Sequence, residues 1–350
     1  MTVYIGCDAH KRYSVFRGVD EKGQAGTSHR VENSRGVFRG FLTKLPAGSP
    51  IAVETIGNWY WLVDEIERAG HNPHLTASGK AKLMMGQINK TDKLDAKGLA
   101  VLLRNGTLPE VWIPPGELRD QRELPRTRMM LVQMRTRLKN RIHATLEKYA
   151  VQIDGVSDLF GVKGRGLVEE RLKELPPFTQ ESMRAELRLL DDTNREIAIC
   201  ERRIKEVVAE TPEMQLLMTM PGVGALLAVV LALEIGDVER FGGPEQLASY
   251  SGTVPRVHSS GGKTYHGQTR PDVNRYLKWA LVEAANCIVL HQSTYEGRHA
   301  VRLYRRIRDR RGHGKAAVAV ARHLAEASYW MLKKKEPYQE PSSSTREQTR

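Results

Sequence analysis

The chain has 350 residues, of which 40% are hydrophobic and 27% charged, and it carries a formal net charge of +13 at pH 7. This length allows two or three domains, each with its own hydrophobic core. No stretch approaches the roughly eighteen uninterrupted apolar residues of a membrane span, and the N-terminus lacks the profile of a signal peptide. We therefore expect a cytoplasmic protein that has no membrane partner.

The three cysteines, Cys7, Cys200 and Cys287, lie far apart and have no CxxC spacing. The spacing indicates neither a disulfide framework nor a zinc site, and we expect three buried thiols.

The positive charge is concentrated in residues 251–335, which contain 17 Lys and Arg but only 5 Asp and Glu. A surplus localised in this way is typical of a surface that binds a polyanion, because each neutralised phosphate releases counterions. A solvated helix face is the alternative explanation.

Residues 1–115 alternate strand and helix patterns. Three short strands, VYIGCD, YSVFRGVD and GTSHRVEN, are followed by a helix over 35–45, the strand IAVE, a helix over 59–69 and the strand PHLTAS. A last helix begins after Thr91, a good capping residue, and is closed by Gly106. This order predicts an RNase H-like α/β sheet, although other α/β folds also fit.

Residues 116–210 contain two long amphipathic patterns, from Leu131 to Tyr149 and from Met183 to Val208. They predict an antiparallel coiled-coil arm, or else two helices packed onto a neighbouring domain. We expect Pro125 to kink or delay the first helix.

Residues 211–335 are expected to form a mostly α-helical domain. MPGVGALL reads as a glycine turn between two helices, a long helix should begin near Pro271, and two more helices should run up to Lys335. The tail, 336–350, has no apolar periodicity and should be disordered.

Four carboxylates stand at the ends of these elements: Asp8 and Glu54 at strand ends, and Asp92 and Asp95 three residues apart on one helix face. Together they would form a cup of oxygens that suits Mg²⁺ or Mn²⁺ in phosphoryl transfer. Taken singly, each has a structural explanation as a turn former, a cap or a first-turn acid.

The motifs GCDAHK, VETIGNWY and KTDKLDAKGLA resemble, in this order, the three acidic motifs of the DEDD transposases of the insertion sequence 110 family, whose N-terminal domain is RuvC-like. The segment LASYSGTVPRVHSSGGKTYHGQTRPDVNRYLKWALVEAA, preceded by MPGVGALLA, resembles that family's second signature. The resemblance spans roughly residues 3 to 335.

The resemblance implies that Asp8, Glu54, Asp92 and Asp95 are metal ligands and that Ser260 attacks a DNA phosphodiester to form a covalent phosphoserine link. The adjacent Ser259 is the alternative nucleophile, and a polar Ser-Gly-Gly hairpin is the structural explanation of this segment. The resemblance also implies excision and insertion of a mobile element and a structured noncoding guide RNA that pairs with donor and target DNA.

Several residues are candidates for nucleic-acid contacts. The backbone N–H groups of Gly222 and Gly224 could hold a phosphate, unless this turn is a plain connector. The cations that flank the serine signature are Arg256, Lys263, Arg270, Arg275 and Lys278. A second basic face is formed by Arg302, Arg305, Arg306, Arg308, Arg310 and Arg311. Tyr265, Tyr276 and Trp279 could stack on bases or belong to the core.

Work on two DNA duplexes predicts a homodimer or homotetramer, with the helical arm as the contact. Two other functions stay open. One is a RuvC-like, metal-dependent, structure-specific nuclease in which water attacks, and the other is a non-catalytic scaffold that binds nucleic acid.

Overall fold

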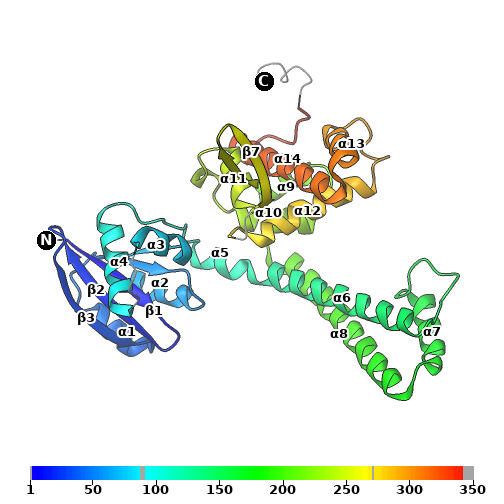
Figure 1. Ribbon diagram of the computed structural model, residues 1–350, viewed down its shortest axis with the longest axis horizontal. Helices are drawn as coiled ribbons and strands as arrows, with labels where there is room; N and C mark the ends of the chain where they lie inside the picture. The colour runs from blue at the N-terminus through cyan, green and yellow to red at the C-terminus, as the bar shows by residue number, and fades with distance from the viewer. Residues whose placement is uncertain (1, 87–90, 270–271, 342–350) are drawn as a thin grey trace. The chain divides into compact units, whose positions relative to one another are not determined.

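The computed structural model describes residues 2–86, 91–269 and 272–341 (Figure 1). The chain divides into two compact units, Met1–Gly116 and Glu117–Arg350. Within the described ranges, no helix combines the length and the apolarity needed to cross a membrane.

The first unit contains a five-stranded sheet in the order β3-β2-β1-β4-β5. The strands are β1 (Val3–Ala9), β2 (Tyr13–Asp20), β3 (Ala25–Glu32), β4 (Pro50–Glu54) and β5 (Asn72–Thr76). β1, β2 and β3 pair antiparallel, whereas β4 runs parallel to both β1 and β5. The predicted meander followed by interleaved strands and helices is confirmed.

Helices cover both faces of this sheet, because successive strand residues point to opposite sides. On one face, α1 (Arg35–Leu42) and α2 (Trp59–Arg68) pack on a core that includes Ile5, Cys7 and Phe16. On the other face lie α3 (Ser78–Met85) and α4 (Asp92–Arg104), whose Ala81 and Leu99 pack with Ala52 of β4. As predicted, Thr91 caps α4, since its hydroxyl accepts from the N–H of Leu94, and a left-handed Gly106 follows the helix.

The second unit begins with a long helix pair. After α5 (Gly116–Gln121) come α6 (Glu123–Lys148), α7 (Val162–Arg171), the 3-10 turn η1 (Leu172–Glu174) and α8 (Pro177–Val207). Ile142 and Leu146 of α6 share a core with Met183 and Leu187 of α8.

Two ion pairs give the direction of this pair. Arg128 pairs with Glu201, and Arg141 pairs with Glu186. Later residues of α6 therefore contact earlier residues of α8. The helices are therefore antiparallel, as predicted. Pro125 lies in the first turn of α6 and has no N–H to donate back to α5, in agreement with the predicted delay of this helix.

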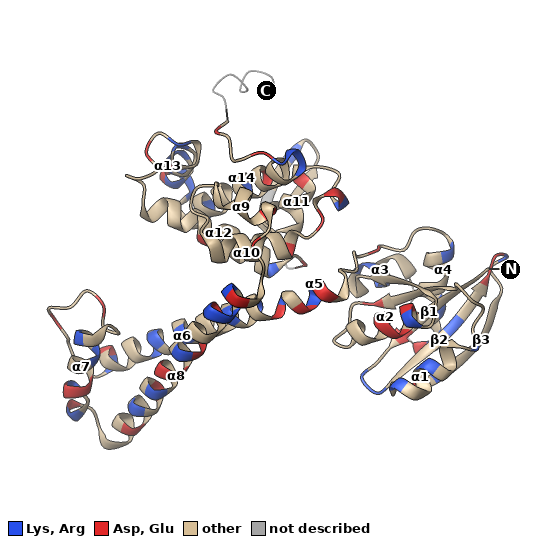
Figure 2. Cartoon of the chain, turned by 180° about the vertical axis from the view of Figure 1, so that it is seen from behind, with Lys and Arg blue, Asp and Glu red and all other residues tan. Residues whose placement is uncertain are grey.

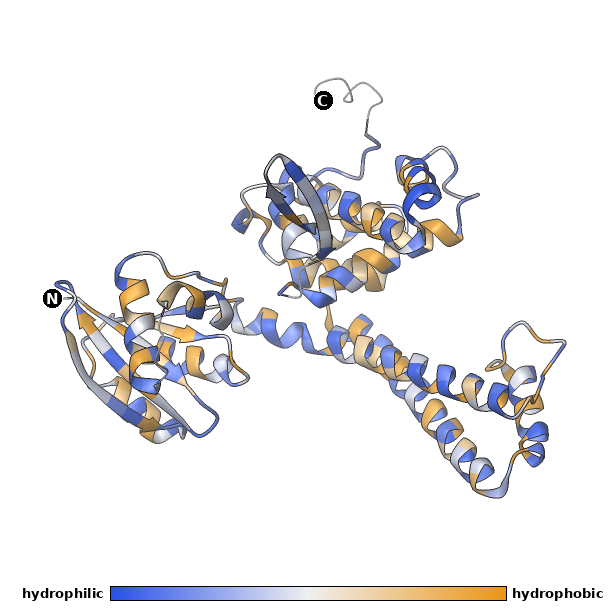
Figure 3. Ribbon diagram, viewed as in Figure 1, coloured by the Kyte–Doolittle hydropathy of each residue, from blue (hydrophilic) through white to orange (hydrophobic). Residues whose placement is uncertain are grey.

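A bundle of short and medium helices follows, comprising α9 (Pro212–Met218), α10 (Ala225–Ile235), η2 (Val238–Arg240), α11 (Pro244–Tyr250), α12 (Arg275–Leu290), α13 (His299–Arg311) and α14 (His313–Lys334). Figure 3 shows the hydrophobic residues concentrated in α10 and in the facing sides of its neighbours. Leu231, Leu281 and Leu324, from α10, α12 and α14, lie in one core.

Glu234 of α10 joins this bundle to the start of α6. The carboxylate is 2% exposed and accepts from Nε and a terminal nitrogen of Arg126 at 2.7 and 2.9 Å. The Arg122 guanidinium donates to the carbonyl oxygens of Leu233 and Glu234. Asn274, which caps α12, donates to the same carboxylate at 2.8 Å.

Three local predictions need correction. The long helix begins at Arg275 rather than near Pro271, because the Asn274 side chain accepts from the N–H groups of Tyr276 and Leu277 and so fixes the start; Pro271 itself lies outside the described residues. Cys7 and Cys200 are buried, but Cys287 is only half-buried.

The third correction concerns the tail. Residues 342–350 lie outside the described part, but those before them are held by specific contacts rather than disordered. The Tyr338 hydroxyl lies 3.0 Å from Nε2 of His323, and Glu340 pairs with Arg298. The prediction of disorder considered only apolar periodicity and missed these polar anchors.

Candidate metal centre and serine hairpin

Asp8 and Glu54 lie near the ends of two neighbouring parallel strands: Asp8 is the last residue but one of β1, and Glu54 is the last residue of β4. Cys7 of β1 is in register with Val53 of β4, so the next residue of each strand, Asp8 and Glu54, reaches the same end of the sheet. They are 7% and 5% exposed. The sequence prediction that these two acids lie together is consistent with this register.

Gly6 brings the acids of α4 to the same place. A Cβ on Gly6 would lie 1.9 Å from the carbonyl oxygen of Ala96 and 2.8 Å from the nitrogen of Ala100, so only glycine allows this approach of helix to strand. Asp92 and Asp95 lie in the first turn of α4. The close packing therefore holds both acids near the end of β1.

His10, which the sequence analysis did not single out, completes the centre. Its Nε2 lies 3.3 Å from Oδ2 of Asp8 and 3.4 Å from Oδ2 of Asp92. The ligand atoms of Asp8, His10 and Asp92 all lie within 4.8 Å of one another. Its signal was its position two residues after Asp8, inside the motif GCDAHK.

The segment that carries His10 is held by two amides. Asn33 and Asn58 donate to the carbonyl oxygen of His10 at 2.6 and 3.0 Å. The Tyr13 hydroxyl donates to Oδ2 of Asp92 at 3.1 Å. These bonds fix the backbone beside Asp8 and orient one of the acids.

The electrostatics of the centre favour a bound cation. Burial raises the pKa of Asp8 to about 6; His10 opposes this shift, while the negative charges of Asp95, Glu54 and Asp92 add to it. Oδ2 of Asp8 and Oε1 of Glu54 are buried and have no hydrogen-bond partner. Buried, unsatisfied carboxylate oxygens are costly unless they are paired or bind a metal. The donor set, oxygen with one imidazole, fits a divalent cation such as Mg²⁺ or Mn²⁺.

The four predicted ligands therefore differ in position. Asp8 and Asp92 belong to the close group with His10, whereas Glu54 and Asp95 lie outside it and act on Asp8 through their charge.

The serine signature forms a β-hairpin in the second unit, made of β6 (Pro255–Ser260) and β7 (Lys263–Thr269). Ser260 pairs with Lys263 across a two-residue turn, in which Gly261 and Gly262 have φ of +58° and +76°. Two positive φ values define a tight type I′ turn, which favours glycine. The hairpin is confirmed, and it presents Ser260 exposed beside its tip.

Ser259 and Ser260 point to opposite sides of β6. Oγ of Ser259 lies 3.3 Å from Oγ1 of Thr264 on the partner strand. The hydroxyl of Ser259 thus has a cross-strand partner within the hairpin.

Gly222 is packed closely against α12. Its N–H donates to the Tyr295 hydroxyl at 3.2 Å, and a Cβ there would lie 2.3 Å from the carbonyl oxygen of Ala284. Close packing on α12 therefore explains why this position is a glycine, and the part of its N–H in phosphate binding stays a prediction. Gly224 is the N-cap residue of α10, and its part in phosphate binding stays a prediction.

Most of the basic candidates are exposed. They lie on the hairpin, at the start of α12 and along α13: Arg256, Lys263, Arg275, Arg302, Arg306, Arg308, Arg310 and Arg311. Figure 2 shows the concentration of basic residues along α13. Several of the candidates have partners within the chain. Lys278 donates to Thr269, Arg302 donates to the carbonyl oxygen of Gly297, and Arg305 and Arg308 pair with Glu296 and Asp309, respectively. Arg270 lies outside the described residues.

The aromatic candidates also divide. Tyr265 is 64% exposed on the hairpin and is free to meet a base. Trp279 packs against the core, and the Tyr276 ring lies 4.5 Å from the guanidinium of Arg126. The core explanation therefore holds for Trp279.

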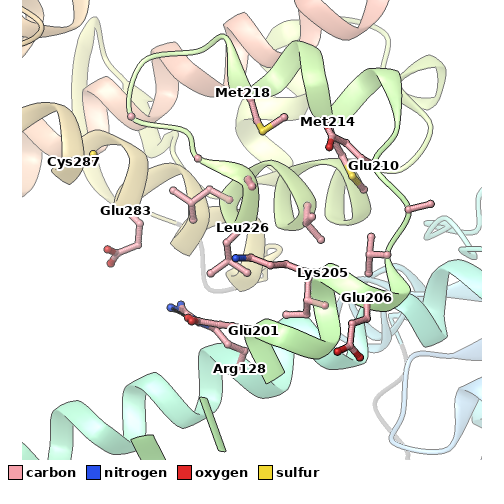
Figure 4. Close-up of a pocket in the computed structure, with 18 of the residues that line it drawn as sticks. Arg128, Glu201, Lys205, Glu206, Glu210, Met214, Met218, Leu226, Glu283 and Cys287 are labelled. Atoms are coloured by element: carbon pink, nitrogen blue, oxygen red, sulfur yellow. Dashed lines mark hydrogen bonds and ion pairs between the residues drawn. The ribbon is translucent and has the colours of Figure 1, made fainter. Parts of the chain in front are cut away.

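A cavity of about 960 Å³ lies between α8, α9, α10 and α12 (Figure 4). Met214, Met218 and Leu226 provide apolar walls, and the ion pair of Arg128 with Glu201 lies at one side. None of the predicted catalytic residues lines it.

Comparison with known proteins accounts for most of the chain. Residues 5–151 match the model of a transposase family with the DEDD domain of IS110, and residues 214–301 match the model described as "Transposase IS116/IS110/IS902 family". The two matches contain the acid centre and the serine hairpin, respectively.

Similar proteins carry the same description. The chain is 26% identical to the transposase for insertion sequence element IS1111A of Coxiella burnetii over 95% of this chain and 90% of the relative. It is 26% identical to a probable family 20 transposase of Pseudomonas aeruginosa, over 81% and 83%. A transposase for IS1328 of Yersinia enterocolitica is 25% identical over 74% and 77%. The chain therefore belongs to the IS116/IS110/IS902 family of DEDD transposases and is an enzyme of DNA recombination.

Proposed function

We propose that this transposase excises and inserts its mobile element by metal-assisted attack of Ser260 on DNA phosphodiesters, directed by a structured noncoding RNA. The observation that carries the proposal is the acid centre, in which buried oxygens of Asp8 and Glu54 lack hydrogen-bond partners.

The N-terminal unit is proposed to be a RuvC-like domain. An antiparallel meander, β1 to β3, that continues into parallel strands β4 and β5 supports this assignment. Acids near the ends of β1 and β4 and in the first turn of α4 also support it.

Asp8, His10 and Asp92 would hold a Mg²⁺ or Mn²⁺ ion, with Glu54 and Asp95 beside them. When bound, such ions neutralise phosphate charge and stabilise the attacking and leaving oxygens of phosphoryl transfer. Tyr13, Asn33 and Asn58 keep His10 and Asp92 in place. Because these positions are fixed by the fold, little reorganisation is needed when the substrate arrives.

Ser260 would act as the nucleophile. Its Oγ forms a bond to phosphorus while one bridging P–O bond breaks, the serine proton passes to a base, and the DNA oxygen leaves as a hydroxyl. The exposed turn position makes this hydroxyl accessible to a strand. The chemistry requires the acid centre and Ser260, from one copy or from two, to meet at one phosphate.

Donor and target DNA are the proposed partners, together with the guide RNA. The exposed cations of the hairpin and α13 support binding of a polyanion. A homodimer or homotetramer joined through the α6–α8 pair would bring together two duplexes.

The test uses purified protein, donor and target DNA, Mg²⁺ and the RNA transcribed from the noncoding flank of the element. On a denaturing gel, the wild type should give recombined strands and a covalent protein–DNA species. Ser260→Ala should give neither, whereas the matched variant Ser259→Ala should give both. Strand cleavage retained in Ser260→Ala, with no covalent species in the wild type, would instead identify a nuclease that uses water.

A further inference from the structure

A second cavity adjoins the acid centre. It has a volume of about 640 Å³. Its lining comes from the β1–β2 turn, the start of β2, the end of β3 and the residue that follows β3: Lys11, Arg12, Tyr13, Arg30, Glu32 and Asn33. Its position in the first unit is independent of the basic candidates in the C-terminal part of the chain.

Tyr13 and Asn33 belong to both places. The Tyr13 hydroxyl donates to the candidate metal ligand Asp92 at 3.1 Å, while the Arg30 guanidinium lies 3.8 Å from the centroid of the same ring. Asn33 lines the cavity and donates to the carbonyl oxygen of His10. The cavity and the acid centre are therefore neighbours that share Tyr13 and Asn33.

The lining has the charge and geometry of an anion site. Lys11, Arg12 and Arg30 are exposed, and Glu32 is the one carboxylate among the lining residues, so positive charge is in excess. Guanidinium groups bind phosphate through paired N–H donors. The Tyr13 ring already restricts the side chain of Arg30, so that less conformational entropy is lost when Arg30 binds an anion. This positive site lies directly beside a cluster of the opposite sign.

We propose that this cavity binds a backbone phosphate of the DNA strand adjacent to the scissile phosphate, with Lys11, Arg12 and Arg30 as its ligands. Tyr13 is a positioning residue, because its ring supports Arg30 and its hydroxyl orients Asp92. The contact is independent of base sequence, since phosphates carry no sequence information. The inference rests on the proposed function, which supplies DNA as the strand that reaches the acid centre.

The experiment measures DNA binding by the full chain in EDTA, so that it does not depend on strand cleavage. Affinity for a DNA duplex is recorded between 50 and 200 mM salt for the wild type and for Lys11→Gln/Arg12→Gln and Arg30→Gln. For each phosphate that a variant no longer neutralises, the ratio of the two affinities should fall by about 3.5-fold, because the salt slope counts neutralised phosphates. The slope reports this change even where C-terminal cations supply most of the affinity.

Lys22→Gln is the matched control, because Lys22 is an exposed cation in the turn at the opposite end of β2. A wild-type slope in the cavity variants, or an equal decrease in Lys22→Gln, would overturn the proposal, as would a decrease seen with RNA but not with DNA. Circular dichroism of each variant identifies any that fail to fold, and Arg30→Lys, which keeps the charge, should retain the slope.

Failure of the proposed serine chemistry can be distinguished from failure of the proposed phosphate binding. Ser260→Ala should keep the wild-type salt slope whether or not Ser260 is the nucleophile, so cavity binding and serine chemistry are tested separately.

Discussion

A Cβ atom on Gly6 would lie 1.9 Å from the carbonyl oxygen of Ala96, a distance at which no side chain fits. The contact joins the middle of β1 to α4, and thereby joins Asp8 to Asp92. The absence of a side chain on Gly6 therefore allows the close approach of α4 to β1 on which the candidate metal centre depends.

Gly6→Ala should therefore lower the free energy of unfolding by about 1–3 kcal/mol, because the added methyl group forces the helix away from the sheet. Chemical denaturation measures this decrease, and Mn²⁺ affinity should fall with it. Gly79→Ala, where a Cβ meets nothing within 4 Å, is the control and should not be destabilised. Equal stability of the Gly6 variant and the wild type would contradict this account of the packing.

His10→Ala should weaken Mn²⁺ binding by about tenfold or more, in the range found when the groups around a metal are removed. Asp8→Asn should weaken it further, because it removes a charge as well as a ligand. Titration calorimetry with Mn²⁺ gives both values. His74→Ala is the control: it removes a histidine of β5 that pairs with Glu110, and it should bind Mn²⁺ as the wild type does. An unchanged Mn²⁺ affinity in His10→Ala would exclude the imidazole from the centre.

Glu234→Gln should reduce the free energy of unfolding by about 3–5 kcal/mol, because it removes the buried negative charge that pairs with Arg122 and Arg126. The exposed pair of Glu239 with Lys333 is the matched comparison, and Glu239→Gln should cost less than about 1 kcal/mol. Similar decreases in both variants would show that burial is not what matters here.

The stability of the second unit should depend on the protonation of His323. Burial, aided by the neighbouring His299, lowers the pKa of His323 to about 4, whereas the unfolded chain titrates near 6.5. Between these two pH values the unfolded state therefore binds more protons than the folded state. The free energy of unfolding should keep its full value above pH 6.5 and should decrease as the pH drops towards 4. The decrease at pH 5 should be about 2 kcal/mol.

Denaturation at pH 7 and pH 5 measures this effect. In His323→Gln the pH-dependent part should disappear, since glutamine keeps a polar group near Tyr338 but does not titrate. An unchanged pH dependence in that variant would assign the effect to another group.

Strand and helix patterns predicted the sheet and α4 well, because alternation and capping are local signals. Thr91 and Gly106, for example, mark the ends of α4 in the sequence and in the structure. The meeting of Asp8 with Asp92 was predicted from residue type and family resemblance rather than from any local pattern.

His10 was not predicted because the sequence prediction rested on carboxylates alone. Its approach to Asp92 arises from a turn whose course the sequence does not specify. The Glu234 interactions were missed for a related reason. Arg122 and Glu234 are 112 residues apart, and no periodic pattern connects them. The start of α12 was misplaced because it was predicted from Pro271 alone, whereas the Asn274 side chain caps the helix.

The paired bonds between Arg126 and Glu234 have a mechanical consequence. The 26 residues of α6 extend over about 39 Å at 1.5 Å per residue, so a tilt of about 10° at this carboxylate would displace the far tip by about 7 Å. Asn274 holds the same carboxylate and begins the helix that follows the serine strand pair. Glu234 thus bonds both the first turn of α6 and the residue that caps α12, so a tilt of the helix pair would strain the start of the helix that follows the hairpin.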